Sequence, residues 1–351
     1  MAEPIITLFF DSQTIIIGAA LLLGFVVAFT IGANDETMTP AVGAGLLSLS
    51  VAVLIGGIFN FIGVFFLGES VSKTVGKGIS TPSAPLNLDM VFVILISMSL
   101  WLFIVSIKGV PISSTQSVIG SVLGVIIMAY GWDPSAINFD TLFEVVASWV
   151  ISPVIGLIGG YFFYWVIMIL RQSIKTTGYS DYEQQEKIAS YALAIFLLFS
   201  VFSRSGNDVA KAIGPLMALD YFSSGIGLLY ALIAGGLGMC LGVITIGRRV
   251  VKKLSSDIVA LSPSSALAAS VSVSLIMFFG TLMGMPLSGS HILVAAFIGV
   301  GFVNKEKVDK DSLKEIGISW VITTPISAIF SAIIFIVFNL LGLFFISLYQ
   351  G

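Results

Sequence analysis

Long uninterrupted apolar runs are the feature that most restricts how this chain can fold. Residues 14–33, for example, contain no charged side chain. A bilayer core about 30 Å thick is spanned by roughly 20 apolar residues in a helix, and lipid forces the backbone to satisfy its own hydrogen bonds. The chain is 57% hydrophobic and 10% charged, whereas a soluble domain is about 25% charged. The sequence therefore predicts an all-α polytopic membrane protein without a large soluble domain.

Twelve apolar segments, in two successive series of six, predict the membrane-embedded helices and half-helices. The first series covers residues 14–33, 37–47, 51–67, 90–107, 112–130 and 141–170, and the second covers 188–202, 209–219, 227–247, 265–283, 292–303 and 318–349. A polar stretch separates them. We therefore expect a first transmembrane repeat at 1–170, a polar linker at 171–187 and a second transmembrane repeat at 188–351. We read the first run as a retained span, because no basic segment precedes it.

An Asn-Asp pair occurs twice, as Asn34-Asp35 and again 173 residues later as Asn207-Asp208. Three further landmarks recur in the same order: Gly56-Gly57 with Gly235-Gly236, Gly109, Pro111 and Ser113 with Gly284, Pro286 and Ser288, and Trp149 and Pro153 with Trp320 and Pro325. Four matches in one order indicate an internal duplication.

Basic residues indicate how the two repeats are oriented. If each Asn-Asp helix crosses the membrane, each repeat crosses an odd number of times and the second repeat is inverted. The stretches 171–187, 248–264 and 304–315 then share a side and carry eleven of the sixteen Lys and Arg residues. The positive-inside rule makes that side cytoplasmic and places the N-terminus outside. Parallel repeats are the alternative, with ten such residues against three, so charge favours inversion without excluding the other case.

Asp35 and Asp208 are candidate ion ligands, because a carboxylate at membrane depth costs about 3 kcal/mol or more unless it is paired. Oxygen-rich surroundings suit a hard cation such as sodium, and transporters bind sodium at such unwound segments. The structural alternative is that both residues cap short helices that begin after them. Recurrence of the pair inside a duplication favours the ion-binding interpretation.

The strings PISSTQS (111–117) and PLSGSH (286–291) each follow a helix-breaking Gly and Pro and open the next apolar helix with hydroxyl groups. A helix N-terminus offers free N–H groups and partial positive charge, which favours an anion. An ordinary Pro-Ser helix start is the alternative. Ser113, Ser117 and Ser121 also line up beside Gly120 and Gly124, and we expect this small-residue face to serve helix packing.

The sequence leaves two possible roles open for three charged residues near the Asn-Asp pairs, and its single histidine and single cysteine exclude several kinds of site. Arg204 and Lys211 flank the second Asn-Asp pair and could either neutralise Asp208 or an anion, or extend to the membrane surface. Two roles also fit Glu36: an extra ion ligand, or a residue of a water-filled vestibule. His291 is the single histidine and Cys240 the single cysteine. A multi-histidine centre, an intrachain disulfide and a cysteine metal site are therefore excluded, and a Ser–His hydrolase is not supported.

These motifs resemble those of the inorganic phosphate transporter (PiT) family. The matching strings are GAND (32–35), GNDVAKAIGP (206–215), PISSTQ (111–116), PLSGSH (286–291) and ESVSKTVGKGI (69–79). The resemblance covers nearly the whole chain. It implies an inverted-repeat transporter with broken helices and re-entrant helical hairpins, a homodimer, and transport of phosphate with a coupling ion.

Two positions depart from the family pattern. Residues 36–38 read Glu-Thr-Met where members usually carry an apolar residue, Ala and Asn, and Gln116 stands where His is common. Glutamine does not titrate, so this half has no proton relay at that position, which favours sodium over protons. Phosphate beside two aspartates also concentrates negative charge that needs cations, two or more sodium ions in this interpretation.

We therefore predict a sodium-coupled symporter that imports phosphate across the plasma membrane by alternating access, with no enzymatic activity, no cofactor and, at a net charge of −3, no nucleic-acid partner. The predicted phosphate ligands are Asn34, Ser113, Ser114, Thr115, Gln116, Asn207, Ser288, Gly289 and Ser290. The predicted sodium ligands are Asp35, Asp208, Asn34, Asn207, Ser113 and Ser288. Proton-coupled phosphate or metal–phosphate transport, sulfate transport, a passive anion channel and a non-transporting receptor remain alternatives.

Overall fold

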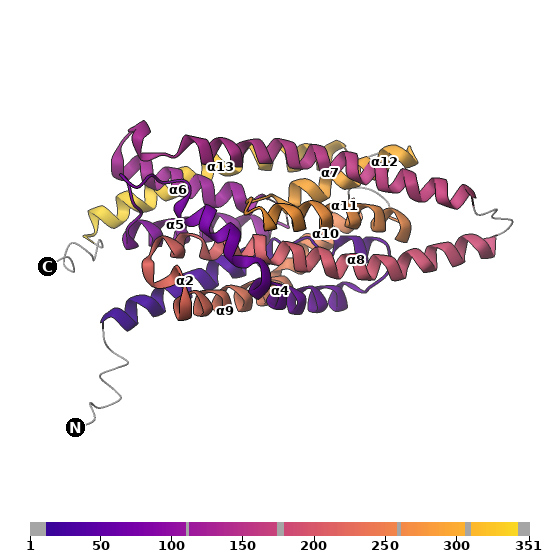
Figure 1. The fold of residues 1–351 in the computed structure, drawn as a ribbon, viewed down its shortest axis with the longest axis horizontal. Helices are drawn as coiled ribbons and strands as arrows, with labels where there is room; N and C mark the ends of the chain where they lie inside the picture. The colour runs from indigo at the N-terminus through magenta and orange to yellow at the C-terminus, as the bar shows by residue number, and fades with distance from the viewer. Residues whose placement is uncertain (1–11, 110–111, 174–178, 258–260, 306–309, 343–351) are drawn as a thin grey trace, which may run out of the picture.

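The protein forms a bundle of long helices whose axes lie roughly along the long axis of the molecule (Figure 1). A computed structural model describes residues 12–109, 112–173, 179–257, 261–305 and 310–342. Every long element within these ranges is a helix, which confirms the predicted all-α class. Pro111, one of the predicted landmarks, lies outside the described residues.

The described chain contains the following elements in order. The first half comprises α2 (Ser12–Ala33), α3 (Thr39–Gly43), α4 (Leu49–Lys77), α5 (Leu88–Ile107), α6 (Ser114–Tyr130), the 3₁₀ turn η1 (Pro134–Ala136) and α7 (Phe139–Ser173). The second half comprises α8 (Tyr179–Ile213), the 3₁₀ turns η2 (Pro215–Ala218) and η3 (Asp220–Phe222), α9 (Gly225–Gly242), the π-helical turn η4 (Val243–Gly247), α10 (Arg248–Asp257), α11 (Pro263–Leu282), α12 (Gly289–Asn304) and α13 (Lys310–Leu340).

Eight helices among the described residues are long and apolar enough to cross a membrane. Helices α7 and α13 expose most of their apolar side chains at the surface of the bundle, including Ile151, Phe162 and Ile333. Such an apolar exterior is stable in lipid and not in water. The fold is therefore that of a multi-pass membrane protein. Helices α6 and α12, with 17 and 16 residues, are shorter and lie inside.

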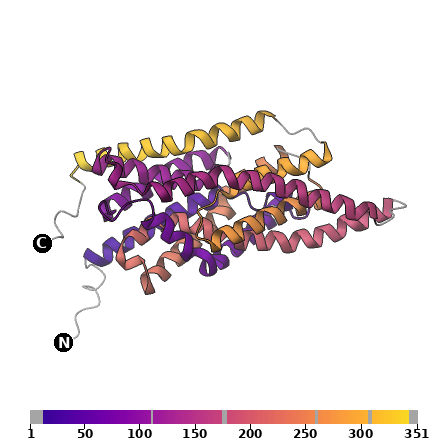
Figure 2. The ribbon, with the colours of Figure 1, turned by 45° about the horizontal axis from the view of Figure 1, so that its top comes forward.

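The main contacts between a helix of the first half and a helix of the second half have counterparts formed by the equivalent helices of the opposite halves. Helix α2 packs against α9 as α8 packs against α4, and α6 packs against α13 as α12 packs against α7. The start of α2 and the end of α13 lie at one end of the bundle, and the end of α7 and the start of α8 lie at the other (Figures 1 and 2). This arrangement supports a pseudo-two-fold duplication. Inversion of the repeats across a membrane stays a prediction.

The two halves differ at their Asn-Asp pairs. Helix α2 ends at Ala33, just before the first pair, whereas α8 continues through Asn207 and Asp208 to Ile213. The expected helix end at residue 202 is therefore wrong. The expected start at residue 188 is wrong as well, because α8 begins at Tyr179. An apolar run marks the membrane-embedded part of a helix but not the polar turns that extend it. In these polar turns, Arg171 of α7 forms an ion pair of 2.7 Å with Glu186 of α8.

Candidate functional site

Both interrupted helices turn at a glycine with a positive φ angle. Gly109 follows α5 with φ 69°, and Gly284 follows α11 with φ 71°. L-amino acids with side chains rarely adopt this region, so glycine permits the chain to reverse here. The connections that follow lead into the first turns of α6 and α12, near the middle of the bundle.

Each Asn of the duplicated pair holds one of these connections. The Asn34 Nδ2 group donates a hydrogen bond of 2.7 Å to the carbonyl of Ile112, and Asn207 Nδ2 donates one of 2.7 Å to the carbonyl of Met285. These carbonyls lie where helices are broken and lack helical partners. The amide of each predicted ligand Asn therefore positions its own half's broken helix.

The two helix starts are linked across the repeats. Thr115 Oγ1 of α6 donates to the carbonyl of Leu287 at 2.9 Å, and Ser290 Oγ of α12 donates to the carbonyl of Ile112 at 3.2 Å. Thr115 and Ser290 are equivalent in the duplication, as are Ile112 and Leu287. The reciprocal contacts bring the two Pro-Ser strings together.

Asp35 accepts its hydrogen bonds from neutral donors. Its Oδ1 atom accepts from the Thr37 backbone N–H at 2.9 Å and from the Thr37 hydroxyl, and its Oδ2 atom accepts from Asn60 Nδ2 at 2.9 Å. Neither aspartate caps a short helix, which was the structural alternative to ion binding, because Met38 occupies the N-cap of α3 and Asp208 lies inside α8. Asn60 was not predicted, although a lone amide in the apolar run 51–67 is a signal for it.

Five buried charged side chains meet between α8 and the segment that follows α2. This charged cluster consists of Asp35, Glu36, Arg204, Asp208 and Lys211, each no more than 5% exposed. The Arg204 guanidinium lies 2.8 Å from Glu36, 3.5 Å from Asp208 and 3.7 Å from Asp35, and Lys211 Nζ lies 2.6 Å from Asp208. Both cations therefore neutralise carboxylates inside the bundle and do not extend to the membrane surface.

A small cavity of about 10 Å³ adjoins the charged cluster, enough for roughly one water molecule. Its walls are Ile31, Asn34, Asp35, Glu36, Ser114, Arg204, Asp208, Ser288, Gly289 and Ser290. A Cβ atom on Gly289 would lie 2.4 Å from Arg204 Cζ, so a side chain at this position would displace the guanidinium. Among the described residues, Ser288 Oγ has no hydrogen-bond partner. Hydroxyls, a helix start and a guanidinium thus converge on one small space.

The remaining predicted ligands lie beside this cavity without lining it. Ser113 caps α6 by accepting from the Gln116 backbone N–H at 3.2 Å, Thr115 bonds the other repeat, and Asn207 bonds Met285. Gln116 is buried in the first turn of α6. The small-residue face of α6 packs as predicted, since Gly120 and Gly124 lie against α13.

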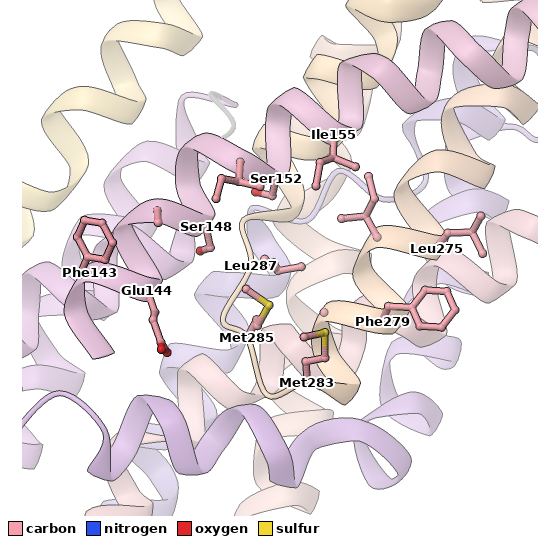
Figure 3. Close-up of a pocket in the computed structure, with 14 residues that line it drawn as sticks. Phe143, Glu144, Ser148, Ser152, Ile155, Leu275, Phe279, Met283, Met285 and Leu287 are labelled. Carbon is pink, nitrogen blue, oxygen red and sulfur yellow. The ribbon is translucent and has the colours of Figure 1, made fainter. Parts of the chain in front are cut away.

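A larger cavity of about 730 Å³ lies between α7 and α11 (Figure 3). Its lining is mostly apolar, with Phe143 and Ile155 from α7 and Phe279 from α11, and Glu144 is the charged residue at one end. The connection that carries Met285 also forms part of its wall. An apolar cavity with a carboxylate offers no attraction for an anion, so the charged cluster is the candidate site.

Membrane-long helices around a buried polar centre, with two broken helices whose starts meet there, define a multi-pass transport protein. The sequence profile described as the Phosphate transporter family matches residues 31–331. The chain belongs to this family, which is a family of transporters and not of enzymes.

Individual relatives extend over almost the whole chain. Proteins named "Putative phosphate permease" from Pyrococcus horikoshii and Pyrococcus furiosus are 30% and 29% identical, covering 92% and 90% of this chain and 97% and 94% of their own lengths. A solved structure titled "The sodium-dependent phosphate transporter" matches with a TM-score of 0.82 and 27% identity, over 93% of this chain and 99% of that chain. The resemblance predicted from the motifs is confirmed.

Proposed function

We propose that this protein is a secondary active symporter that imports inorganic phosphate by alternating access, with sodium as a coupling cation. The observation that carries this proposal is the convergence of both helix starts and both aspartates of the Asn-Asp pairs on one small cavity. Helix N-termini attract anions and carboxylates attract cations, so a single centre of this kind can bind both.

The chemistry of the cavity favours phosphate over sulfate. Ser290, Gly289 and Arg204 supply donors to an oxyanion, but Glu36 and Asp35 also line the space and only accept hydrogen bonds when ionised. Phosphate at neutral pH still carries a P–OH group that can donate to a carboxylate. Sulfate carries no proton, and two of its oxygens facing carboxylates would repel them. This difference disfavours sulfate by an unpaired, repulsive contact.

The charge balance requires a mobile cation. Three carboxylates and two side-chain cations give the charged cluster a formal charge of −1 when all are ionised. A phosphate adds one or two further negative charges, which a buried site accommodates only with added positive charge. Asp35, with the amide of Asn34 nearby, offers oxygen ligands that suit sodium, and the matched solved structure is titled as sodium-dependent.

Proton coupling is the second candidate, and a specific observation favours it. Arg204 and Lys211 already contact the carboxylates that would bind sodium. A proton on Glu36 would release Arg204 toward the anion without any metal ion. The two candidates predict different driving gradients.

The test is uptake of radiolabelled phosphate into proteoliposomes that contain the purified protein. Sodium, potassium and proton gradients are imposed separately, with sulfate as competitor. We expect sodium-driven accumulation above equilibrium that sulfate does not inhibit. Accumulation driven by protons alone would replace sodium in the proposal, and inhibition by sulfate would change the cargo. Flux that stops at equilibrium would indicate a channel, and binding without flux a receptor.

We further propose that the protein is a homodimer in the plasma membrane, with its N-terminus outside and residues 171–187 and 248–264 in the cytoplasm. The broad apolar faces of α7 and α13 leave area for a second copy within the bilayer. Mass measurement of the protein in lipid nanodiscs tests this state. A single copy per disc at all loading ratios would contradict it.

A further inference from the structure

The charged cluster is asymmetric with respect to the duplication. The offset of 173 residues that relates Asp35 to Asp208 also relates Ile31 to Arg204 and Met38 to Lys211. Ile31 and Met38 are buried apolar residues. Both cations of the cluster therefore belong to α8, and the first half has no charged counterpart for either.

Lys211 occupies the immediate surroundings of Asp208. Its side chain is fully buried, and its Nζ atom lies 2.6 Å from Asp208 Oδ1, one helical turn away. At that distance the ammonium group is in direct contact with the carboxylate, where a bound monovalent cation would otherwise sit. A second cation beside the same oxygen would meet like-charge repulsion in a poorly screened interior.

The surroundings of Asp35 differ. Its oxygens accept from neutral groups of Thr37 and Asn60, and the Arg204 guanidinium lies 3.7 Å away, nearer to Glu36. The water-sized cavity is lined by Asp35 and Glu36 as well as by Asp208, and Ser288 Oγ, 2% exposed, lines it without a partner among the described residues. Space and an unsatisfied oxygen are thus available in the cavity beside Asp35, whereas the Oδ1 atom of Asp208 is already in direct contact with the Lys211 ammonium group.

We propose that Lys211 is a tethered cation that fills the ion position at Asp208, so that phosphate transport is coupled to one mobile cation fewer than the duplicated aspartates indicate. This inference rests on the proposed symport function and fixes its stoichiometry. The mobile cation binds on the Asp35 side, and the ammonium group of α8 provides the second positive charge in every cycle. The two sodium sites inferred from the duplication then reduce to one.

The decisive substitution is Lys211→Met, which removes the charge, shortens the side chain by one heavy atom and introduces the residue found at the equivalent position 38. Removing Lys211 leaves Asp208 with the Arg204 guanidinium alone, which is shared with Glu36 and Asp35, so the buried cluster has one more uncompensated negative charge. Asp208 should then recruit a sodium ion from solution. Lys108→Met is the matched control, because Lys108 is exposed at the end of α5.

The experiment measures sodium and phosphate fluxes with two isotopes in the same proteoliposomes. We expect the sodium-to-phosphate ratio to be higher by one in Lys211→Met than in the wild type and in Lys108→Met. The Hill coefficient for sodium should rise from about 1 to about 2, since it is bounded by the number of sites. An unchanged ratio in a variant that still transports would overturn the inference.

A binding measurement decides the case in which Lys211→Met folds but does not transport. Equilibrium binding of labelled sodium to the purified full-length protein should give one more ion per chain in Lys211→Met than in the wild type. The double substitution Asp208→Asn with Lys211→Met removes the carboxylate and should return the count to the wild-type value. Equal counts in all three proteins would overturn the inference.

Failure of the proposed function gives a different result. In that case the wild type itself shows no accumulation of phosphate under any gradient, whatever the variant does. If Lys211→Met does not fold, Lys211→Asn replaces it in the same binding measurement, because its amide is neutral and too short to reach the ammonium position. The same gain of one sodium ion is expected, and its absence counts against the tethered cation.

Discussion

A single hydroxyl group at the start of α12 connects the two halves of the chain to the charged cluster. Ser290 Oγ lies 3.1 Å from Glu36 Oε2 and 3.2 Å from the carbonyl of Ile112. A hydroxyl has one proton and can donate to one acceptor at a time. Its equivalent, Thr115, faces a carbonyl and no carboxylate. Ser290 can therefore exchange a structural bond for a bond to Glu36, and Thr115 cannot.

Ser290→Ala should weaken phosphate transport more than Thr115→Val. Thr115→Val removes the side-chain donor to the Leu287 carbonyl, whereas in Ser290→Ala the Ile112 carbonyl keeps Asn34 Nδ2 as its donor. Ser290→Ala instead removes the hydroxyl donor to the buried Glu36 carboxylate, and an unsatisfied buried group costs about 1–3 kcal/mol, more when it is charged. We expect the KM for phosphate to rise about tenfold or more in Ser290→Ala, which corresponds to about 1.4 kcal/mol. Uptake kinetics in proteoliposomes measure it, and Thr115→Ser, which keeps its hydroxyl, is the control. Equal KM values in wild type and Ser290→Ala would contradict the role.

Arg204→Lys should abolish most phosphate uptake although it keeps the positive charge. The planar guanidinium reaches three carboxylates at once, whereas an ammonium group is a point charge with a different reach. We expect at least about a tenfold loss of uptake, consistent with one or two lost charge-assisted contacts. Arg249→Lys on the exposed surface of α10 is the control. Wild-type uptake in Arg204→Lys would show that the fork geometry is not needed.

Sequence patterns located most of this site but not its internal pairing. The doubled Asn-Asp and Pro-Ser strings identified residues that line or border the cavity. Lys211, three residues after Asp208, was visible as a partner, but its choice between pairing and extending to the surface depends on depth in the bundle. Asn60 contacts Asp35 across 25 residues of chain, and no local pattern encodes that contact.

At the scale of helices, a proline explains why the two equivalent segments fold differently. Pro40 follows Asp35 by five residues and Pro215 follows Asp208 by seven. Proline cannot donate to the helix ladder and blocks the preceding turn. The nearer proline opens α3 after an irregular Asn34–Met38 segment, whereas α8 continues to Ile213. Equal treatment of the two halves therefore predicted a break in α8 that does not occur.

Packing of α6 against α13 depends on the glycine face of α6. A Cβ atom on Gly124 would lie 2.4 Å from the Ala328 carbonyl oxygen and 2.1 Å from Ser331 Oγ. Backbone cannot move away as a flexible side chain can, and small residues allow such close approach between membrane helices.

Gly124→Ala should lower the thermal stability of the purified protein. Overpacking a well-packed contact costs about 1–3 kcal/mol, and we expect a fall in Tm of several degrees in a thermal-shift measurement. Gly18→Ala on α2 is the matched control, because a Cβ atom there meets nothing within 4 Å. A Tm in Gly124→Ala equal to that of Gly18→Ala would show that α6 and α13 separate easily.

At the scale of the whole molecule, the side-chain cations of the polar centre come from one helix and the water-sized cavity from both halves. Helix α8 carries Arg204 and Lys211, while the cavity walls include Asn34 and Ser114 from the first half and Ser288 from the second. A relative movement of the halves would open the cavity while the cations stay with α8. Such a movement is what the proposed alternating access requires.

Inversion of the repeats predicts that equivalent positions lie on opposite sides of the membrane. Ser135 precedes α7 and Lys314 lies near the start of α13, and both are exposed. In a Cys240→Ser background, a membrane-impermeant maleimide added to intact cells should label Ser135→Cys, because the basic residues of 304–315 favour a cytoplasmic location for Lys314. Lys314→Cys should react only after permeabilisation, and the cysteine-free parent should not react. Labelling of both positions from outside would show that the repeats are parallel. It would also remove the inverted geometry on which the proposed relative movement of the two halves depends.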